Sequence, residues 1–317
     1  CVLSLQFYFA GTMDLATTIV MMIASFLMYA ALDSAGNFSS LLRAVDISVD
    51  KAKSVLAIEN MDIDGEYIET ETQNIEMDHV DFAYDTRKVI DDISLSIPEK
   101  TTAAFVGPSG SGKTTICHLI ARFWDVQSGQ VKLDNRDVRA YNMNSLMENF
   151  SFVFQSVYLF HDTIANNIRF GQPEASVDMV IDAAKRACCH DFISKLPDGY
   201  DTVLGEAGAS LSGGQKQRIS IARAIMKDAP IIILDEATAN VDPENERELM
   251  LAIKELTKEK TILMIAHRLK TVRNADRIYV IDKGKISQQG THEELLKNDG
   301  IYRDFVSARS EAIGWKL

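Results

Sequence analysis

Basic residues are scarce in this sequence relative to acidic ones. Lysine and arginine number 33 against 45 aspartates and glutamates, which gives a formal net charge of −12. Proteins that bind nucleic acids through the phosphate backbone carry an excess of positive charge. The composition therefore predicts no nucleic-acid partner, although local basic contacts to the phosphates of a nucleotide remain compatible with it.

Cysteine is also rare, with four residues in the whole chain. Cys188 and Cys189 are adjacent, and none of the four has the spacing of a metal site. We interpret them as reduced structural thiols and expect the domain that contains them to lie in the cytosol.

Long uncharged runs are confined to the N-terminal end. Only Asp14 and Asp33 are charged among residues 1–42, and the 18 residues Leu15–Leu32 carry no charge. A helix of that length extends about 27 Å, close to the thickness of a bilayer's hydrocarbon core. A buried helix of a soluble domain is the alternative, and the features of a signal peptide are missing. Because the first residue is Cys1, we expect the sequence to begin inside a longer protein.

Residues 1–58 are therefore interpreted as the C-terminal part of a transmembrane domain. They contain the end of one helix, a turn at Gly11 and Thr12, and a last helix that continues beyond the bilayer as an amphipathic extension, with Gly36 as a candidate bend. Basic residues on the extension place it in the cytoplasm by the positive-inside rule. The acidic residues 59–74 are predicted to be a water-facing linker.

Short β-rich runs and amphipathic helices begin at residue 75 and continue to about residue 309. The first run alternates as an edge strand does, and 231–235 has the β-branched composition of a strand buried on both faces. Helices follow several runs, which predicts an α/β fold with a largely parallel sheet, an antiparallel β subdomain and an α-helical insert at about 163–225. Residues 310–317 form a tail. The predicted strands are Ile75–Tyr84, Ile90–Ile97, Thr102–Val106, Ile231–Asp235, Thr261–Ile265 and Arg277–Ile281.

The strand at 102–106 leads into a loop with the phosphate-binding pattern GxxxxGK[ST]. Glycines allow the backbone to curl around a phosphate with its N–H groups inward. The lysine supplies positive charge, the hydroxyl at the end of the pattern can ligate Mg²⁺, and the following helix points its positive end at the anion. The predicted nucleotide contacts are Gly107, Pro108, Ser109, Gly110, Ser111, Gly112, Lys113, Thr114 and Thr115.

Two carboxylates, Asp235 and Glu236, end the buried strand at 231–235. Open α/β sheets bind ligands at the carboxyl ends of their strands, so we expect this pair to face the phosphate loop. One carboxylate can hold Mg²⁺ and the other can orient the water that attacks a γ-phosphate.

Further motifs resemble those of ATP-binding cassette (ABC) proteins. The segment Leu211-Ser212-Gly213-Gly214-Gln215 is similar to the family's signature. Tyr84 resembles the aromatic residue that stacks on adenine, and Gln155 resembles the Q-loop glutamine. Residues 239–242 lie where the family has its D-loop, although Asn240 replaces the usual alanine, which leaves cross-dimer coupling in doubt. His267 resembles the switch histidine, and the resemblance covers roughly residues 70–309.

The resemblance implies that ATP and Mg²⁺ are cofactors and that two such domains sandwich each ATP between the phosphate loop of one and the signature of the other. Glu236 is then the catalytic base, His267 contacts the γ-phosphate, and Gln155 senses Mg²⁺ and water. Asp235 and Thr114 complete the metal site. Ser212, Gly213, Gly214, Gln215 and Asp242 are the expected contacts to the partner's nucleotide.

The order of an apolar segment before the ATPase resembles half-transporters of the exporter fold. These are multi-pass proteins of the cell membrane that pair as homodimers or heterodimers, with the ATPase in the cytoplasm. We expect ATP-driven transport of a small substrate, most simply export. Two stretches, 151–171 and 236–246, and the terminal Trp315-Lys316-Leu317 also resemble a subgroup that takes up metal–siderophore complexes. A soluble ATPase acting on DNA or the ribosome and a binding module without hydrolysis are further alternatives.

Overall fold

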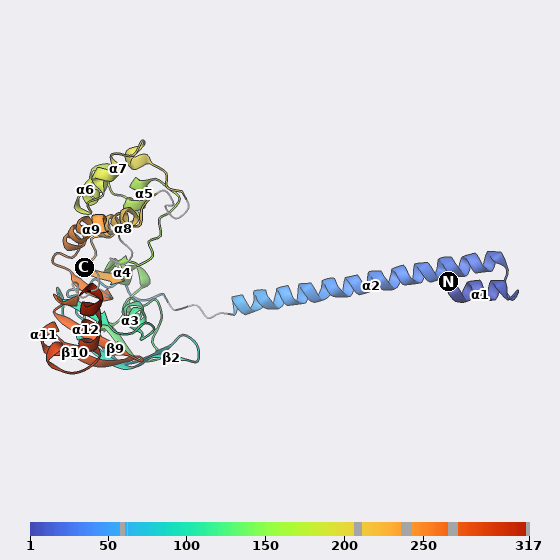
Figure 1. Ribbon diagram of the computed structural model, residues 1–317, viewed down its shortest axis with the longest axis horizontal. Helices are drawn as coiled ribbons and strands as arrows, with labels where there is room; N and C mark the ends of the chain where they lie inside the picture. Colours follow the sequence, from blue (N-terminus) through green and yellow to red (C-terminus); the bar gives the residue numbers. More distant parts are fainter. Residues whose placement is uncertain (58–60, 62, 206–210, 236–242, 266–271, 315–317) are drawn as a thin grey trace. The chain divides into compact units, whose positions relative to one another are not determined.

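A computed structural model describes the chain except for residues 58–60, 62, 206–210, 236–242, 266–271 and 315–317. The chain folds into two compact units, Cys1–Asn60 and Met61–Leu317 (Figure 1). The predicted site residues Glu236, His267 and Asp242 lie outside the described residues, as does Asn240.

The first unit contains a short helix α1, Val2–Phe9, and a long helix α2, Leu15–Leu56. Gly11 has φ 70° in the predicted turn, and the Asp14 side chain caps α2 by accepting a hydrogen bond from the Thr17 amide. The helix runs through Gly36 without a break. At 1.5 Å per residue its 42 residues extend about 63 Å, roughly twice the hydrocarbon thickness of a bilayer.

Helix α2 is long and apolar enough to cross a membrane, and 6% of its apolar window is buried. The core helix of a soluble domain would instead be mostly buried. The low burial therefore favours the membrane interpretation of Leu15–Leu32 over the buried-helix alternative.

Two sheets organise the second unit. Strands β2-β1-β4-β5 form an antiparallel sheet, and β10-β9-β3-β8-β7-β6 form a sheet that is parallel except for β10. The α/β fold with an antiparallel part is confirmed, but the expected edge strand at 75–84 is wrong because β1 pairs with strands on both sides. The strands are β1 Ile75–Ala83, β2 Lys88–Ile97, β3 Thr102–Val106, β4 Ser128–Leu133, β5 Arg136–Asp137, β6 Phe150–Val153, β7 Ile231–Asp235, β8 Thr261–Ile265, β9 Arg277–Asp282 and β10 Lys285–Gly290.

Helices α5, α6 and α7 gather at the end of this unit remote from β2, β9 and β10 (Figure 1), in the stretch where helical patterns predicted them. The helices are α3 Lys113–Ile120, α4 Met143–Glu148, α5 Ile164–Arg169, α6 Val177–Arg186, α7 His190–Ile193, α8 Gly213–Lys227, α9 Pro243–Leu256, α11 His292–Lys297 and α12 Ile301–Gly314, with short 3-10 turns at η1 Val138–Ala140 and η2 Gly199–Asp201.

The parallel strands β3, β6, β7 and β8 are buried on both faces, and successive side chains along them point into different parts of the core. Phe105 and Ile233 point into a cluster with α3 and the antiparallel sheet, whereas Ile232 and Leu234 point into a second cluster with α8 and α9. Helix α3 is therefore packed against the sheet that carries its own phosphate loop. The thiol of Cys189 is buried in the second cluster, where desolvation raises its pKa to about 12 and disfavours the reactive thiolate.

The acidic segment after α2 is not a plain water-facing linker, which corrects the prediction for that stretch. The Glu66 amide donates to the Ala140 carbonyl at 2.9 Å, and the Asn142 amide donates to the Glu66 carbonyl at 2.8 Å. Ile68 is buried, and Gly65 lies so close to the backbone of Tyr141 that a Cβ would sit 2.3 Å from its carbonyl carbon. Residues 63–72 are thus a strap that packs on the domain, while its acidic side chains face outward.

Candidate nucleotide-binding site

The phosphate loop joins the end of β3 to the start of α3. Gly107 has φ 145°, and a Cβ on it would lie 2.0 Å from the Ile281 carbonyl oxygen. Gly112 has φ 106° and caps α3 in the left-handed region, with a Cβ position 2.8 Å from Ile90 Cδ1. Both positions need glycine, because their φ is positive and because a Cβ would collide with a neighbouring atom. The backbone course of the loop is therefore fixed at these two positions.

Lys113 is buried at the first position of α3. Its ammonium group donates to the carbonyl oxygens of Gly107, at 3.1 Å, and Pro108, at 2.7 Å. The charge is thus held over the loop whose amides would surround a phosphate. The hydroxyl of Ser111 is also buried, and in the described part of the chain it has no hydrogen-bond partner. A loop with a fixed cation and an unpartnered hydroxyl is suited to an anionic ligand.

A cavity of about 870 Å³ opens at this loop. Its described lining includes the phosphate-loop residues from Pro108 to Thr115 and the ring of Tyr84. The Tyr84 hydroxyl lies 3.2 Å from Thr115 Oγ1, and the residue is 44% exposed. The structure therefore brings together the predicted aromatic contact and the predicted phosphate contacts in one cavity.

Asp235 lies at the same edge of the sheet as the phosphate loop. In the parallel register Phe105 pairs with Ile265, and Ile265 pairs with Asp235. Adjacent strands are about 4.8 Å apart, so the backbone of Asp235 lies about 10 Å from that of Phe105, just before the loop begins. The predicted carboxylate is thus at the carboxyl end of β7, partly buried and two strands from the phosphate loop.

Gln155 lies two residues beyond β6, which pairs with β7 on the side away from β8. Val153 at the end of β6 pairs with Leu234. Gln155 follows Val153 by two residues, on an exposed stretch of chain, and Asp235 directly follows Leu234. Gln155 therefore lies at the same carboxyl edge of the sheet as Asp235. The order of strands brings Gln155 and Asp235 to one edge although they are 80 positions apart in the sequence.

The signature segment begins α8 and lies outside the cavity described above. Ser212 caps the helix: its Oγ accepts from the Gln215 amide at 3.3 Å, and the Gln215 side chain accepts from the Ser212 amide at 2.9 Å. This reciprocal pair is a capping box, which the spacing S-x-x-Q could have predicted. The predicted signature contacts Ser212, Gly213, Gly214 and Gln215 are thus not among the described residues that line the cavity at the phosphate loop.

The turn between β9 and β10 is a part of the cavity that the sequence motifs did not identify. Lys283 and Gly284 have φ values of 48° and 80° and line the cavity with Asp282. The Gly284 amide donates to the Ser111 carbonyl at 3.1 Å, and its carbonyl accepts from the Asp91 amide at 2.9 Å. The Lys-Gly pair signals a hairpin turn, but only the folded chain shows that the turn joins β2 to the phosphate loop.

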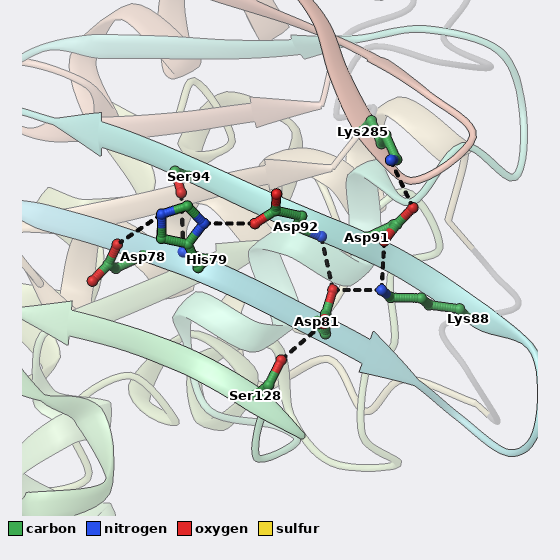
Figure 2. A network of polar contacts seen from close by, with 9 residues as sticks. All are labelled: Asp78, His79, Asp81, Lys88, Asp91, Asp92, Ser94, Ser128 and Lys285. Carbon is green, nitrogen blue, oxygen red and sulfur yellow. Dashed lines mark hydrogen bonds and ion pairs between the residues drawn. The ribbon is translucent and has the colours of Figure 1, made fainter.

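Charged residues of β1 and β2 form a network next to the cavity (Figure 2). Lys88, which lines the cavity, lies 2.7 Å from Asp81, and it also pairs with Asp91, which Lys285 reaches at 3.0 Å. Lys88 together with the Asp92 amide and the Ser128 hydroxyl lowers the pKa of Asp81 to about 2. The network therefore keeps Asp81 ionised and ties β1, β2 and β10 together at the edge of the cavity.

His79 extends the same network on an exposed surface (Figure 2). Its Nδ1 lies 2.7 Å from Asp92 Oδ1, and its amide donates to Ser94 Oγ at 2.9 Å. The hydrogen bond with Asp92 is the main cause that raises the pKa of His79, and the charges of Asp92 and Asp78 add to it. Both His79 and Asp92 have positive φ, so a bulge in β1 and β2 aligns their side chains.

Comparisons with known proteins agree with this geometry. Residues 90–239 match the family model described as ABC transporter. The chain is 50% identical over 231 residues to the ATP-dependent lipid A-core flippase of Desulfotalea psychrophila, covering 73% of this chain and 40% of that protein. It is 45% identical over 266 residues to the flippase of the same name from Sodalis glossinidius, covering 83% of this chain and 44% of that protein.

Among solved structures, the chain resembles a bacterial Atm1-family ABC exporter with ATP bound. The TM-score is 0.76 at 33% identity, and the match covers 94% of this chain and 53% of the exporter. This chain spans less than half the length of the two flippases. These names describe flippases and an exporter, and none of them names siderophore uptake, so the resemblance to that subgroup is not confirmed.

Proposed function

Because this chain carries the ATPase domain of an ABC transporter, we propose that it binds ATP with Mg²⁺ and hydrolyses it to drive export of a small amphiphilic substrate across a membrane. One observation carries the proposal. The phosphate loop, with the Lys113 ammonium held over it, lies at the same sheet edge as the carboxylate of Asp235. That arrangement supports binding of a metal-bound triphosphate.

The loop amides and Lys113 hold the phosphates, and the N-terminus of α3 adds its positive dipole end. Tyr84 stacks on the base. Oxygen donors are the ligands that Mg²⁺ prefers, and Thr114, Asp235 and Gln155 offer a hydroxyl, a carboxylate and an amide oxygen. When bound, Mg²⁺ neutralises charge on the phosphates; these three residues would hold it.

Glu236 orients and polarises the attacking water, and His267 contacts the γ-phosphate. In-line attack requires positioning and charge stabilisation more than covalent chemistry, so the proposed roles are to hold water, phosphate and cation in line. The position of Glu236 directly after Asp235 in the sequence supports its role as the base.

We propose that the active protein is a dimer of two half-transporters, identical or different. Ser212, Gly213, Gly214 and Gln215 lie outside the cavity of their own chain, which supports their use on the nucleotide of a partner. The end of a helix with free amides is a suitable contact for a γ-phosphate. Asp242 at the end of the D-loop is proposed to contribute to the same interface.

We infer that the whole protein is a multi-pass protein of the cell membrane with the ATPase on the cytoplasmic side. The apolar part of α2 is long enough to span, and relatives are named as lipid A-core flippases. These names support an amphiphilic substrate for the export proposed here. Transport assays that compare inside-out vesicles with intact cells measure the direction.

The decisive experiment is the variant Glu236→Gln. We expect it to retain ATP binding and to lose about 10²–10⁴-fold in turnover, because it keeps the side chain's shape and removes the base. Glu174→Gln, at an exposed acid outside the cavity, is the matched control and should keep full turnover. Unchanged hydrolysis in Glu236→Gln would contradict the assignment of the base, and a parent protein without ATPase activity would contradict the function.

A further inference from the structure

Three groups hold the side chain of Tyr84. The Phe82 ring meets it edge-on at a centroid distance of 4.9 Å and an interplanar angle of 87°. The Trp124 ring also meets it edge-on, at 5.3 Å and 86°. The Tyr84 hydroxyl lies 3.2 Å from Thr115 Oγ1. Edge-to-face contacts are favourable aromatic geometries, so the plane of the Tyr84 ring is determined by its neighbours.

The backbone that carries Tyr84 is held by the same turn that carries Trp124. The Ala83 amide donates to Gln127 Oε1 at 2.7 Å, and Gln127 Nε2 donates to the Ala83 carbonyl at 2.8 Å. The Gln127 side chain therefore pairs with the last residue of β1 as a neighbouring strand would. Trp124 thus contacts the ring of Tyr84, and Gln127 holds the backbone of the residue just before it.

The turn itself is anchored. Arg122 is buried, and its Nε donates to Asp125 Oδ1 at 2.9 Å while Nη1 donates to the Tyr141 carbonyl at 3.3 Å. The turn directly follows α3, and α3 begins at the phosphate loop. One continuous segment therefore carries the phosphate contacts at its start and the support of Tyr84 at its end.

Trp124 is 48% exposed and does not line the cavity that Tyr84 lines. Among the described residues, the ring contact with Tyr84 connects Trp124 to that cavity. Gln127 contacts backbone rather than cavity.

We propose that Trp124 and Gln127 are positioning residues that hold the Tyr84 ring in the orientation needed to stack on the base. They thereby determine the difference in affinity between a nucleotide and a triphosphate that has no base. The inference rests on the proposed function, in which Tyr84 stacks on adenine. It assigns the specificity for the nucleoside part of the ligand to the turn after α3.

The test compares MgATP with magnesium tripolyphosphate, which has the phosphates and no base, by calorimetric titration of the whole 317-residue chain in detergent. Trp124→Leu and Gln127→Met should each weaken ATP binding about two- to tenfold, the range expected for losing one aromatic or hydrogen-bonded contact, and leave tripolyphosphate binding unchanged. Trp124→Phe should preserve most of the ATP affinity because it keeps an aromatic edge. Phe170→Leu, at an exposed aromatic outside the cavity, should change neither ligand.

Equal weakening of both ligands would overturn the proposal, because it would mean that the variants disturb the phosphate loop. ATP affinity unchanged in both Trp124→Leu and Gln127→Met would also overturn it. A parent chain that binds neither ligand would instead contradict the proposed function, so the two failures are distinguishable.

Tryptophan fluorescence gives a readout that needs no change at the turn. The chain has two tryptophans, Trp124 and Trp315, so Trp315→Phe leaves Trp124 as its only one. ATP should change the emission of Trp124 and tripolyphosphate should not, since only ATP brings a base onto Tyr84. An equal response to both ligands would overturn the proposal.

Discussion

At the scale of single residues, the phosphate loop depends on where a Cβ can be placed. Gly107 and Gly110 both have positive φ, at 145° and 73°. A Cβ on Gly107 would collide with the Ile281 carbonyl, whereas a Cβ on Gly110 would have no heavy atom of the described residues within 4 Å. The two glycines share a conformational requirement and differ in packing, so substitutions at both separate the two effects.

We expect Gly107→Ala to lower the free energy of unfolding by about 2–4 kcal/mol, since it adds backbone displacement to the strain of positive φ. Gly110→Ala, the matched control, should cost about 1 kcal/mol from the conformation alone. Denaturant unfolding of the two variants measures the difference. Equal destabilisation would show that contact with Ile281 contributes nothing.

At the scale of elements, the strap at 63–72 determines where the chain enters the nucleotide-binding unit. It is held by backbone hydrogen bonds to residues 140–143 and by the burial of Ile68. The Thr70 hydroxyl donates to Asn149 Oδ1 at 2.7 Å, one residue before β6 begins. The strap therefore packs against the start of the strand that leads to Gln155.

Ile68→Ala should lower the free energy of unfolding of this unit by about 2–4 kcal/mol, because it removes buried methyl groups and leaves a cavity. Glu69→Ala, at the adjacent exposed position, should change it by less than about 0.5 kcal/mol. Chemical denaturation monitored by circular dichroism compares the two variants. A similar small loss in both would indicate that the strap is not packed in solution.

The contact between His79 of β1 and Asp92 of β2 predicts a pH dependence of stability. The pKa of His79 is raised above its ordinary value of 6.5 by Asp92 and Asp78. The charged imidazole therefore contributes its full stabilisation below pH 6.5, and this contribution is lost as the pH rises through the raised pKa. We therefore expect His79→Gln to lower the unfolding temperature, relative to wild type, by more at pH 6 than at pH 9.

The measurement for His79 is thermal unfolding of the two proteins across that pH range. Asp78→Asn is a control that removes the weaker, more distant charge, 4.0 Å from His79 Nε2, and should have a smaller effect than Asp92→Asn. A difference between wild type and His79→Gln that stays constant with pH would contradict the ion pair.

At the scale of the whole molecule, the proposed dimer predicts complementation between two inactive chains. Lys113→Ala removes the phosphate-loop charge, and Ser212→Glu places a negative charge where the partner's γ-phosphate is expected. A dimer of one chain of each kind retains one site with both wild-type parts. We expect ATPase activity to reappear on co-expression and isolation of the mixed dimer, whereas each variant alone stays inactive.

The complementation experiment also distinguishes a signature that acts on the partner's nucleotide from one that acts on the nucleotide of its own chain. If Ser212 acts on the nucleotide of its own chain, every mixed dimer contains an intact phosphate loop only beside a damaged signature, and activity does not return. Lys113→Ala paired with a second copy of itself is the baseline.

The sequence alone determined the local chemistry. The pattern GxxxxGK[ST] located the phosphate loop, and the runs at 102–106, 231–235 and 261–265 predicted strands with the bounds observed for β3, β7 and β8. These signals are short-range: a glycine's φ, a helix cap or a β-branched run depends on neighbours along the chain. The signature segment and the apolar run before the domain could be identified from the sequence because each is a continuous stretch of neighbouring residues.

Only the tertiary structure decided which distant residues share a site. Strand order brings Gln155 and Asp235 to one edge, places β1 between two partners and seats the turn at Lys283 and Gly284 against the phosphate loop. The support of Tyr84 by Trp124 and Gln127 and the packing of the strap on residues 140–149 are decided in the same way. Such contacts depend on close approach of segments separated by tens of residues, which is set by the packing of the whole core and is encoded in no local pattern.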